Sequence, residues 1–257
     1  MGSIFPLLIA FIIAKSIIRQ KKENQASKAI PMISVVDDAY NRYGPSETML
    51  RVCTEYFMHS NTAPTMEQNL QLMEVRLLLQ QYETLEGQLF AIHAESLPVN
   101  LRLRYYNLVI QHAIMTGATK RAVDVFANTQ DFAEKYLMYH EEDMLNYFDN
   151  AATVCALTGD FEESERYCEA MECFLQKRNI LTSENFIPKF ARIKMLFLAH
   201  RDAEAEALSK QMKSEISGFH QFRYAWESSF LMRELEKTQM FRQETEQGEY
   251  GGMMQAY

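Results

Sequence analysis

From about residue 31 onward, hydrophobic residues recur at the three- to four-residue spacing of amphipathic helices, and brief turn signals separate these stretches. No segment alternates apolar and polar residues as a half-buried strand does. Five similar turns begin at residues 44, 80, 117, 159 and 200, at steps of 36, 37, 42 and 41 residues. A second set of breaks, at 60–64, 96–100, 139–142, 179–183 and residue 218, separates the resulting units. This near-constant period predicts an all-α fold, an α-solenoid of stacked antiparallel helix pairs, with an irregular all-α bundle as the alternative.

One unit has the residues of a known repeat. Residues 145–171 resemble a tetratricopeptide repeat: Ala152 stands at the small position and Phe148 at the aromatic position. Residues 159–161 close the first helix, and Ser164 stands where the second helix packs tightly on the first. The resemblance therefore implies TPR-like helix pairs in this part of the chain.

A second unit, residues 103–126, matches more loosely, because Ile110 replaces the small residue although Gly117 and Ala122 are in register. The motif is specific only over about 103–178, whereas the period extends the predicted repeat domain to 34–242. Steps of 41 and 42 residues exceed the usual 34 and predict longer helices or a related fold.

The two ends of this domain have different compositions. Residues 219–241 predict a last helix that caps the solenoid towards solvent, with Trp226 and Phe230 among its apolar positions. The tail at 243–257, with three glycines and three glutamates, is predicted to be disordered.

The first residues predict a membrane anchor. Residues 4–18 are almost entirely apolar and are followed by Arg19, Lys21 and Lys22. As a helix, 15 residues span roughly 22 Å, which is short of a bilayer core of about 30 Å. We predict a single-pass transmembrane or signal-anchor segment with a basic stop at 1–22, followed by a linker at 23–33. A cleaved signal peptide, an in-plane interfacial helix and a structural helix outside the membrane are the alternatives. The charges follow the apolar run, which is the reverse of a signal peptide.

The charge distribution supports this topology. The net charge is −8, but residues 1–30 carry +4, so the rest of the chain carries −12. Basic residues are retained on the cytoplasmic side, which predicts an outside N-terminus and a cytoplasmic helical domain. An acidic body excludes a phosphate-backbone binder, so no nucleic-acid partner is expected. Four cysteines at helical positions are expected to act as small hydrophobic residues.

The sequence contains no motif for catalysis, a cofactor or a metal. The six histidines form no i, i+4 pair, and Cys168 and Cys173 are too far apart for a Cys-x-x-Cys clamp. Residues 140–143 are the densest ionisable cluster, and the acidic run within 162–172 is predicted to be a solvated face. The 16 methionines are expected mainly to fill the core, with a Met-lined groove as the alternative. We therefore expect no enzyme, cofactor or metal site.

The tetratricopeptide resemblance implies that the first helix of each pair lines a concave groove that holds a peptide or partner helix. Polar residues of the two matching units would lie on this side and bind a protein or peptide partner that is neutral or basic. They are Arg104, Asn107, Gln111, Asn146, Asp149 and Thr153.

The resulting hypothesis is a membrane-anchored scaffold or adaptor for protein–protein interaction, held in the lipid bilayer by residues 4–18. The alternatives are a structural subunit of a membrane-protein complex, and a helical enzyme or regulatory domain with an unrecognised site. The sequence predicts neither the partner nor the oligomeric state.

Overall fold

A computed structural model describes residues 34–137, 140, 144–178 and 182–238, and these ranges are helical, with no strand. No helix within these ranges is long and apolar enough to cross a membrane. The predicted anchor at 1–22, linker at 23–33 and tail at 243–257 lie outside the described residues.

Among the described residues, ten α-helices precede a last helical stretch at 227–238, and two short 3₁₀ helices, η1 and η3, lie between them. Their bounds are α2 (Val35–Tyr43), α3 (Glu47–Ser60), α4 (Met66–Leu78), α5 (Tyr82–Phe90), η1 (Ala94–Ser96), α6 (Val99–Met115), α7 (Thr119–Leu137), α8 (Met144–Leu157), α9 (Phe161–Arg178), η3 (Ser183–Phe186), α10 (Ile187–Leu198) and α11 (Asp202–Gly218). All five predicted turns are confirmed, because each lies between the two helices of a pair.

Local residues explain where these helices begin and end. The Ser46 hydroxyl accepts a hydrogen bond from the Met49 N–H at 3.2 Å and caps α3. Thr65 and Gln68 form a capping box at the start of α4. After α6 and α8 the chain turns through Gly117 and Gly159, whose φ angles of 71° and 81° favour glycine.

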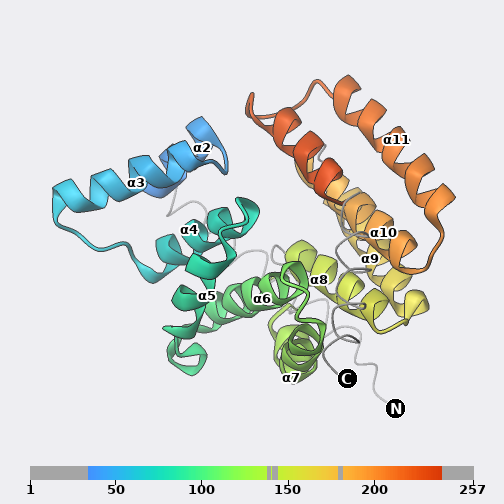
Figure 1. The fold of residues 1–257 in the computed structure, drawn as a ribbon, viewed down its shortest axis with the longest axis horizontal. Helices are drawn as coiled ribbons and strands as arrows, with labels where there is room; N and C mark the ends of the chain where they lie inside the picture. Colours follow the sequence, from blue (N-terminus) through green and yellow to red (C-terminus); the bar gives the residue numbers. More distant parts are fainter. Residues whose placement is uncertain (1–33, 138–139, 141–143, 179–181, 239–257) are drawn as a thin grey trace, which may run out of the picture.

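The helices pack in two ways. The two helices of each pair contact one another, and the first helices contact their neighbours in the series α2, α4, α6, α8, α10. The pairs follow one another around an arc from α2 and α3 to α10 and α11 (Figure 1). The five hydrophobic clusters each combine helices of adjoining units, so the core continues along the arc.

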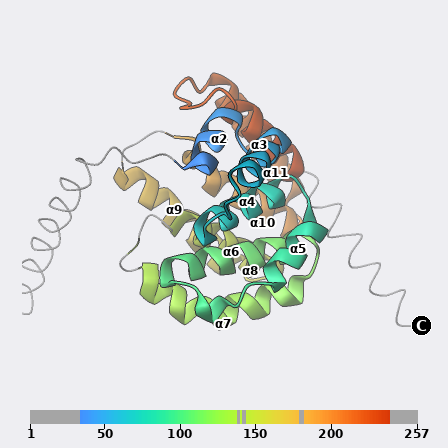
Figure 2. The ribbon, with the colours of Figure 1, turned by 90° about the vertical axis from the view of Figure 1, so that its left-hand side faces the viewer.

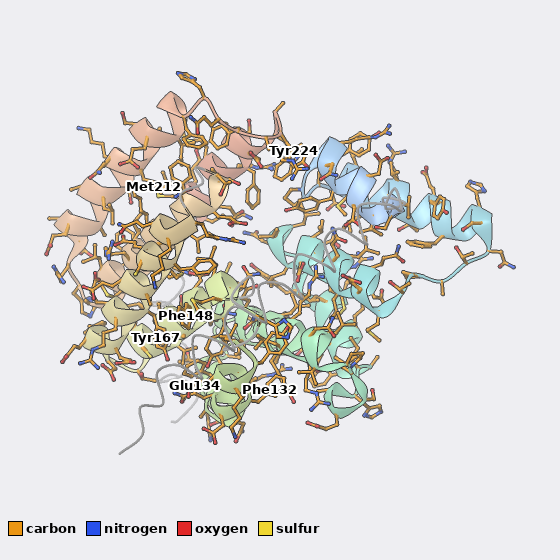
Figure 3. The ribbon with its side chains drawn as sticks, turned by 180° about the vertical axis from the view of Figure 1, so that it is seen from behind. Phe132, Glu134, Phe148, Tyr167, Met212 and Tyr224 are labelled. Atoms are coloured by element: carbon orange, nitrogen blue, oxygen red, sulfur yellow. The ribbon has the colours of Figure 1, made fainter. Side chains whose placement is uncertain are left out.

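Small residues allow the closest helix contact. Ala152 on α8 and Ser164 on α9 are fully buried, and the Ser164 hydroxyl donates to the Ala152 carbonyl at 2.8 Å. The neighbouring rings of Phe148 and Tyr167 meet across the same pair at 5.2 Å between centroids (Figure 3).

The C-terminal segment differs from the prediction. The expected solvent-capping helix over 219–241 begins only at residue 227, and residues 239–241 lie outside the described ranges. Residues 219–226 return across the arc, and the Trp226 indole N–H donates to the Asn41 carbonyl of α2 at 3.1 Å. Tyr224 accordingly lies beside α2 in Figure 3, and Figure 2 shows α2 close to the loop that follows α11. The last unit thus contacts the first, which the sequence pattern did not predict.

Candidate functional site

A cavity of about 320 Å³ lies between the first helices and the C-terminal helix 227–238. Helices α4, α6, α8 and α10 supply one side, and the C-terminal helix supplies the other. Half of the lining side chains are apolar, including Leu78, Met115, Phe190 and Phe230. The volume lies near the lower limit of ligand pockets, about 300 Å³, and suits one or two large side chains of a partner.

The charges in this cavity are paired. The Lys194 ammonium of α10 binds the Asp149 carboxylate of α8 at 2.9 Å, and both side chains are about one-fifth exposed. Lys237 binds Glu234 within the C-terminal helix at 2.8 Å. These two pairs make the described lining electrically neutral, so the cavity favours an uncharged group.

Three of the predicted partner-binding residues line the cavity: Gln111 on α6, and Asn146 and Asp149 on α8. Asp149 is engaged by Lys194. Gln111 is half-buried and Asn146 is exposed, and their amides make no hydrogen bond within the described residues. Each amide has a donor and an acceptor to offer to a partner.

The other three predicted residues do not reach this cavity. The Arg104 guanidinium binds both carboxylate oxygens of Glu74 at 2.5 Å and lines a separate depression. Asn107 is 7% exposed, and Thr153 is 1% exposed with its hydroxyl donating to the Asp149 carbonyl at 2.9 Å. The structure therefore does not present Asn107 and Thr153 to a partner.

Several of the predicted residues instead join one unit to the next. Glu74 of α4 binds Arg104 of α6, the Asn150 amide of α8 donates to Asn107 of α6 at 3.3 Å, and Asp149 binds Lys194 of α10. These contacts form a polar ladder along the first helices. The partners Glu74, Asn150 and Lys194 were missed from sequence, although each stands roughly one repeat period from its partner.

The acidic run on α9 is only partly a solvated face. The Arg192 guanidinium of α10 binds Glu165 at 2.6 Å and Glu172 at 2.5 Å, so these two carboxylates are used in packing. Burial opposes the charge on Arg192, but the hydrogen bonds to both glutamates outweigh it and raise the pKa of Arg192 above its ordinary value. Glu162 remains 82% exposed, as predicted for the whole run.

The described residues include no group of three or more His, Cys, Asp or Glu side chains placed to hold a metal ion. Cys168 is buried, and its burial raises the pKa of the thiol to about 12, whereas Cys173 is exposed on α9. Of the cluster at 140–143 the structure describes only His140, whose ring stacks on Tyr136 at 4.2 Å.

The methionines have mixed surroundings. Met49, Met73 and Met171 are buried in the core, but Met58 is 76% exposed and Met115 lines the cavity. Core filling is thus confirmed for only part of the set.

Comparison of the chain with protein-family models, curated proteins and solved structures gives no match. The function is therefore inferred from the cavity itself. The cavity is electrically neutral, half of its lining side chains are apolar, and two of its amides make no hydrogen bond within the described residues.

Proposed function

We propose that this protein is a membrane-anchored helical-repeat scaffold or adaptor that binds a partner protein through the cavity between its first helices and its C-terminal helix. The observation that carries the proposal is the position of Gln111 and Asn146, whose amides line the half-apolar cavity without a hydrogen-bond partner among the described residues. Apolar pockets with a few polar groups are typical binding sites. The partner inserts an apolar side chain, and its neighbouring backbone bonds the two amides.

The TPR-like solenoid is part of this proposal. It is supported by the regular succession of helix pairs, by the polar ladder between first helices, and by small buried residues such as Ala122, Ala152 and Ser164. Repeat arrays of this kind present extended concave surfaces. The body outside the first 30 residues carries −12, so a neutral or basic partner is favoured around the neutral cavity.

A substitution on the cavity wall tests the binding site. Asn146→Arg places a bulky charge at the cavity, and Gln176→Arg makes the same charge change on the exposed outer side of α9. After purification from solubilised membranes, we expect a partner to be recovered with the wild type and with Gln176→Arg, but at least about tenfold less with Asn146→Arg. Equal recovery with both variants would contradict binding at this cavity.

We further propose that residues 4–18 anchor the protein and that the helical domain faces the cytoplasm. Cys173 is the exposed thiol of α9 and provides a natural reporter. A membrane-impermeant maleimide should label Cys173 only after cells are permeabilised, with Cys173→Ser as the control. Labelling in intact cells would contradict this orientation, and extraction of the protein by carbonate would contradict the anchor.

A further inference from the structure

The C-terminal helix meets the first units along a narrow seam. A second hollow of about 210 Å³ lies beside the 320 Å³ cavity. Leu78 of α4 and Phe230, Glu234 and Lys237 of the C-terminal helix line both hollows. A thin row of side chains therefore separates the two spaces, in contrast to the continuous core between neighbouring units.

Polar contacts hold both ends of this seam. At one end the Lys237 ammonium donates to the carbonyl of Leu78, the last residue of α4, at 2.6 Å. The final carbonyls of a helix have no partner within it, and the helix dipole favours a cation there. At the other end the Trp226 indole N–H donates to the Asn41 carbonyl at 3.1 Å.

Aromatic contacts complete the Trp226 end. The indole meets the ring of Tyr40 edge-on at 5.3 Å and stacks on Tyr224 at 5.7 Å. It also lies against Gly44, where a Cβ atom would come within 2.5 Å of the ring. We call the contacts of Trp226 and Lys237 with the first two helix pairs the clasp.

A neighbouring face of the C-terminal helix packs against α10 and α11. Leu231 and Leu235 are 5% and 3% exposed and belong to the hydrophobic cluster of α10 and α11. Separation of the clasp would leave this apolar packing intact, whereas removal of the whole helix would expose it. The C-terminal helix and α10–α11 therefore form one unit that meets α2 and α4 at the clasp.

We propose that the clasp is a gate to the cavity, and that a partner's apolar segment enters between Leu78 and Phe230 by parting it. This inference rests on the proposed function and adds the route of entry. In the closed state the clasp holds the C-terminal helix across the cavity. Binding then shifts the population towards the open state, because only that state admits the segment.

The protein contains a built-in reporter of this gate, since Trp226 is its single tryptophan. In the full-length protein, Lys237→Ala removes the clasp contact at the far end of the helix from Trp226. We expect a red-shifted Trp226 emission and at least a twofold larger acrylamide quenching constant. The control is Lys213→Ala, which removes an exposed lysine of α11 and should leave both quantities unchanged. Unchanged Trp226 emission and quenching in folded Lys237→Ala would overturn the gate, because the two ends would then not open together.

A disulfide tests whether opening is needed for binding. A Cβ built on Gly44 lies 2.8 Å from Trp226 Cγ. With a C–C bond of about 1.5 Å, the two Cβ atoms are at most about 4.3 Å apart, which is within the upper limit of about 4.5 Å for a disulfide. In Gly44→Cys/Trp226→Cys with Cys173→Ser, oxidation locks the clasp. We expect partner recovery to fall at least about tenfold on oxidation and to return with dithiothreitol, while Trp226→Cys with Cys173→Ser, which lacks the second cysteine of the pair, shows no redox dependence.

The outcomes separate the gate from the proposed function. Equal recovery from the oxidised and reduced double-cysteine protein would overturn the gate, while a continued loss with Asn146→Arg would still support binding at the cavity. If no partner is recovered even with the wild type, the proposed function fails, and Trp226 quenching in Lys237→Ala still decides whether the clasp opens.

Discussion

Replacing Gly44 with alanine should destabilise the protein strongly, because the substitution both strains the backbone and introduces a steric clash. Gly44 follows α2 with φ 62° and ψ −170°, a region occupied almost only by glycine. Forcing another residue there costs about 1–3 kcal/mol. The added methyl would also lie 2.5 Å from Cδ2 of the Trp226 indole. Overpacking of this kind costs about 1–3 kcal/mol, so the total is about 2–6 kcal/mol.

A double-mutant cycle separates the two costs. In a Trp226→Ala background the indole is gone, so Gly44→Ala should cost only the backbone term of about 1–3 kcal/mol. The coupling between the two substitutions should therefore be about 1–3 kcal/mol. Gly117→Ala is a second control, since its φ is 71° but no atom lies within 4 Å of the added methyl. It should show no coupling with Trp226→Ala.

Urea unfolding of the full-length protein in detergent, followed by circular dichroism at 222 nm, measures these free energies without relying on Trp226 fluorescence. Effects of Gly44→Ala and Trp226→Ala that are additive within about 0.5 kcal/mol would contradict the predicted clash. The added methyl would then not clash with the indole, and the close approach of Trp226 to Gly44 would be contradicted.

Three further predictions concern the ion pairs, the thiols and pH. Arg192→Ala leaves two glutamates without their shared partner and should lower the free energy of unfolding by about 1.5–3 kcal/mol. Arg166→Ala removes an exposed, solvent-screened ion pair and should lower it far less. Equal effects of the two substitutions in urea unfolding would contradict this. At pH 8 iodoacetamide should modify Cys173 and leave Cys168 unmodified. Burial raises the pKa of the Cys168 thiol to about 12, and only the thiolate reacts. Modification of both cysteines in the native protein, measured by mass spectrometry, would contradict the burial of Cys168. Burial, with smaller effects from neighbouring carboxylates, raises the pKa of Tyr40 from 10 to about 12, so its contribution to stability is complete below pH 10 and is lost as pH rises towards 12. Trp226 emission should shift to the red across that window, and a constant emission would contradict the clasp geometry.

The sequence predicted local structure well. Five turns were placed correctly because glycine, capping residues and helical periodicity act within a few residues. The small positions Ala152 and Ser164 were likewise found, since close helix packing demands small side chains wherever it occurs. These features are determined by residues that lie close together in the sequence, so the sequence alone predicts them.

The long-range contacts could not be predicted in the same way. Trp226 and Asn41 are 185 positions apart, and no period links them, so the helical pattern at 219–241 indicated only a cap. The polar ladder shows a related limit. Arg104 and Asn107 have the residue types of a peptide-binding face, and only the neighbouring helix reveals that their partners are Glu74 and Asn150. A polar residue on a helix can bind a ligand or contact the neighbouring helix pair, and the residue type alone does not distinguish these two roles.

Site-specific photo-cross-linking tests the binding site most directly. A benzoylphenylalanine replaces Asn146 at the cavity or, as the control, Gln176 on the exposed side of α9, in the full-length protein expressed in cells. We expect a discrete cross-linked partner from position 146 and none from position 176. A partner that cross-links equally from both positions, or only from position 176, would contradict binding at the concave cavity.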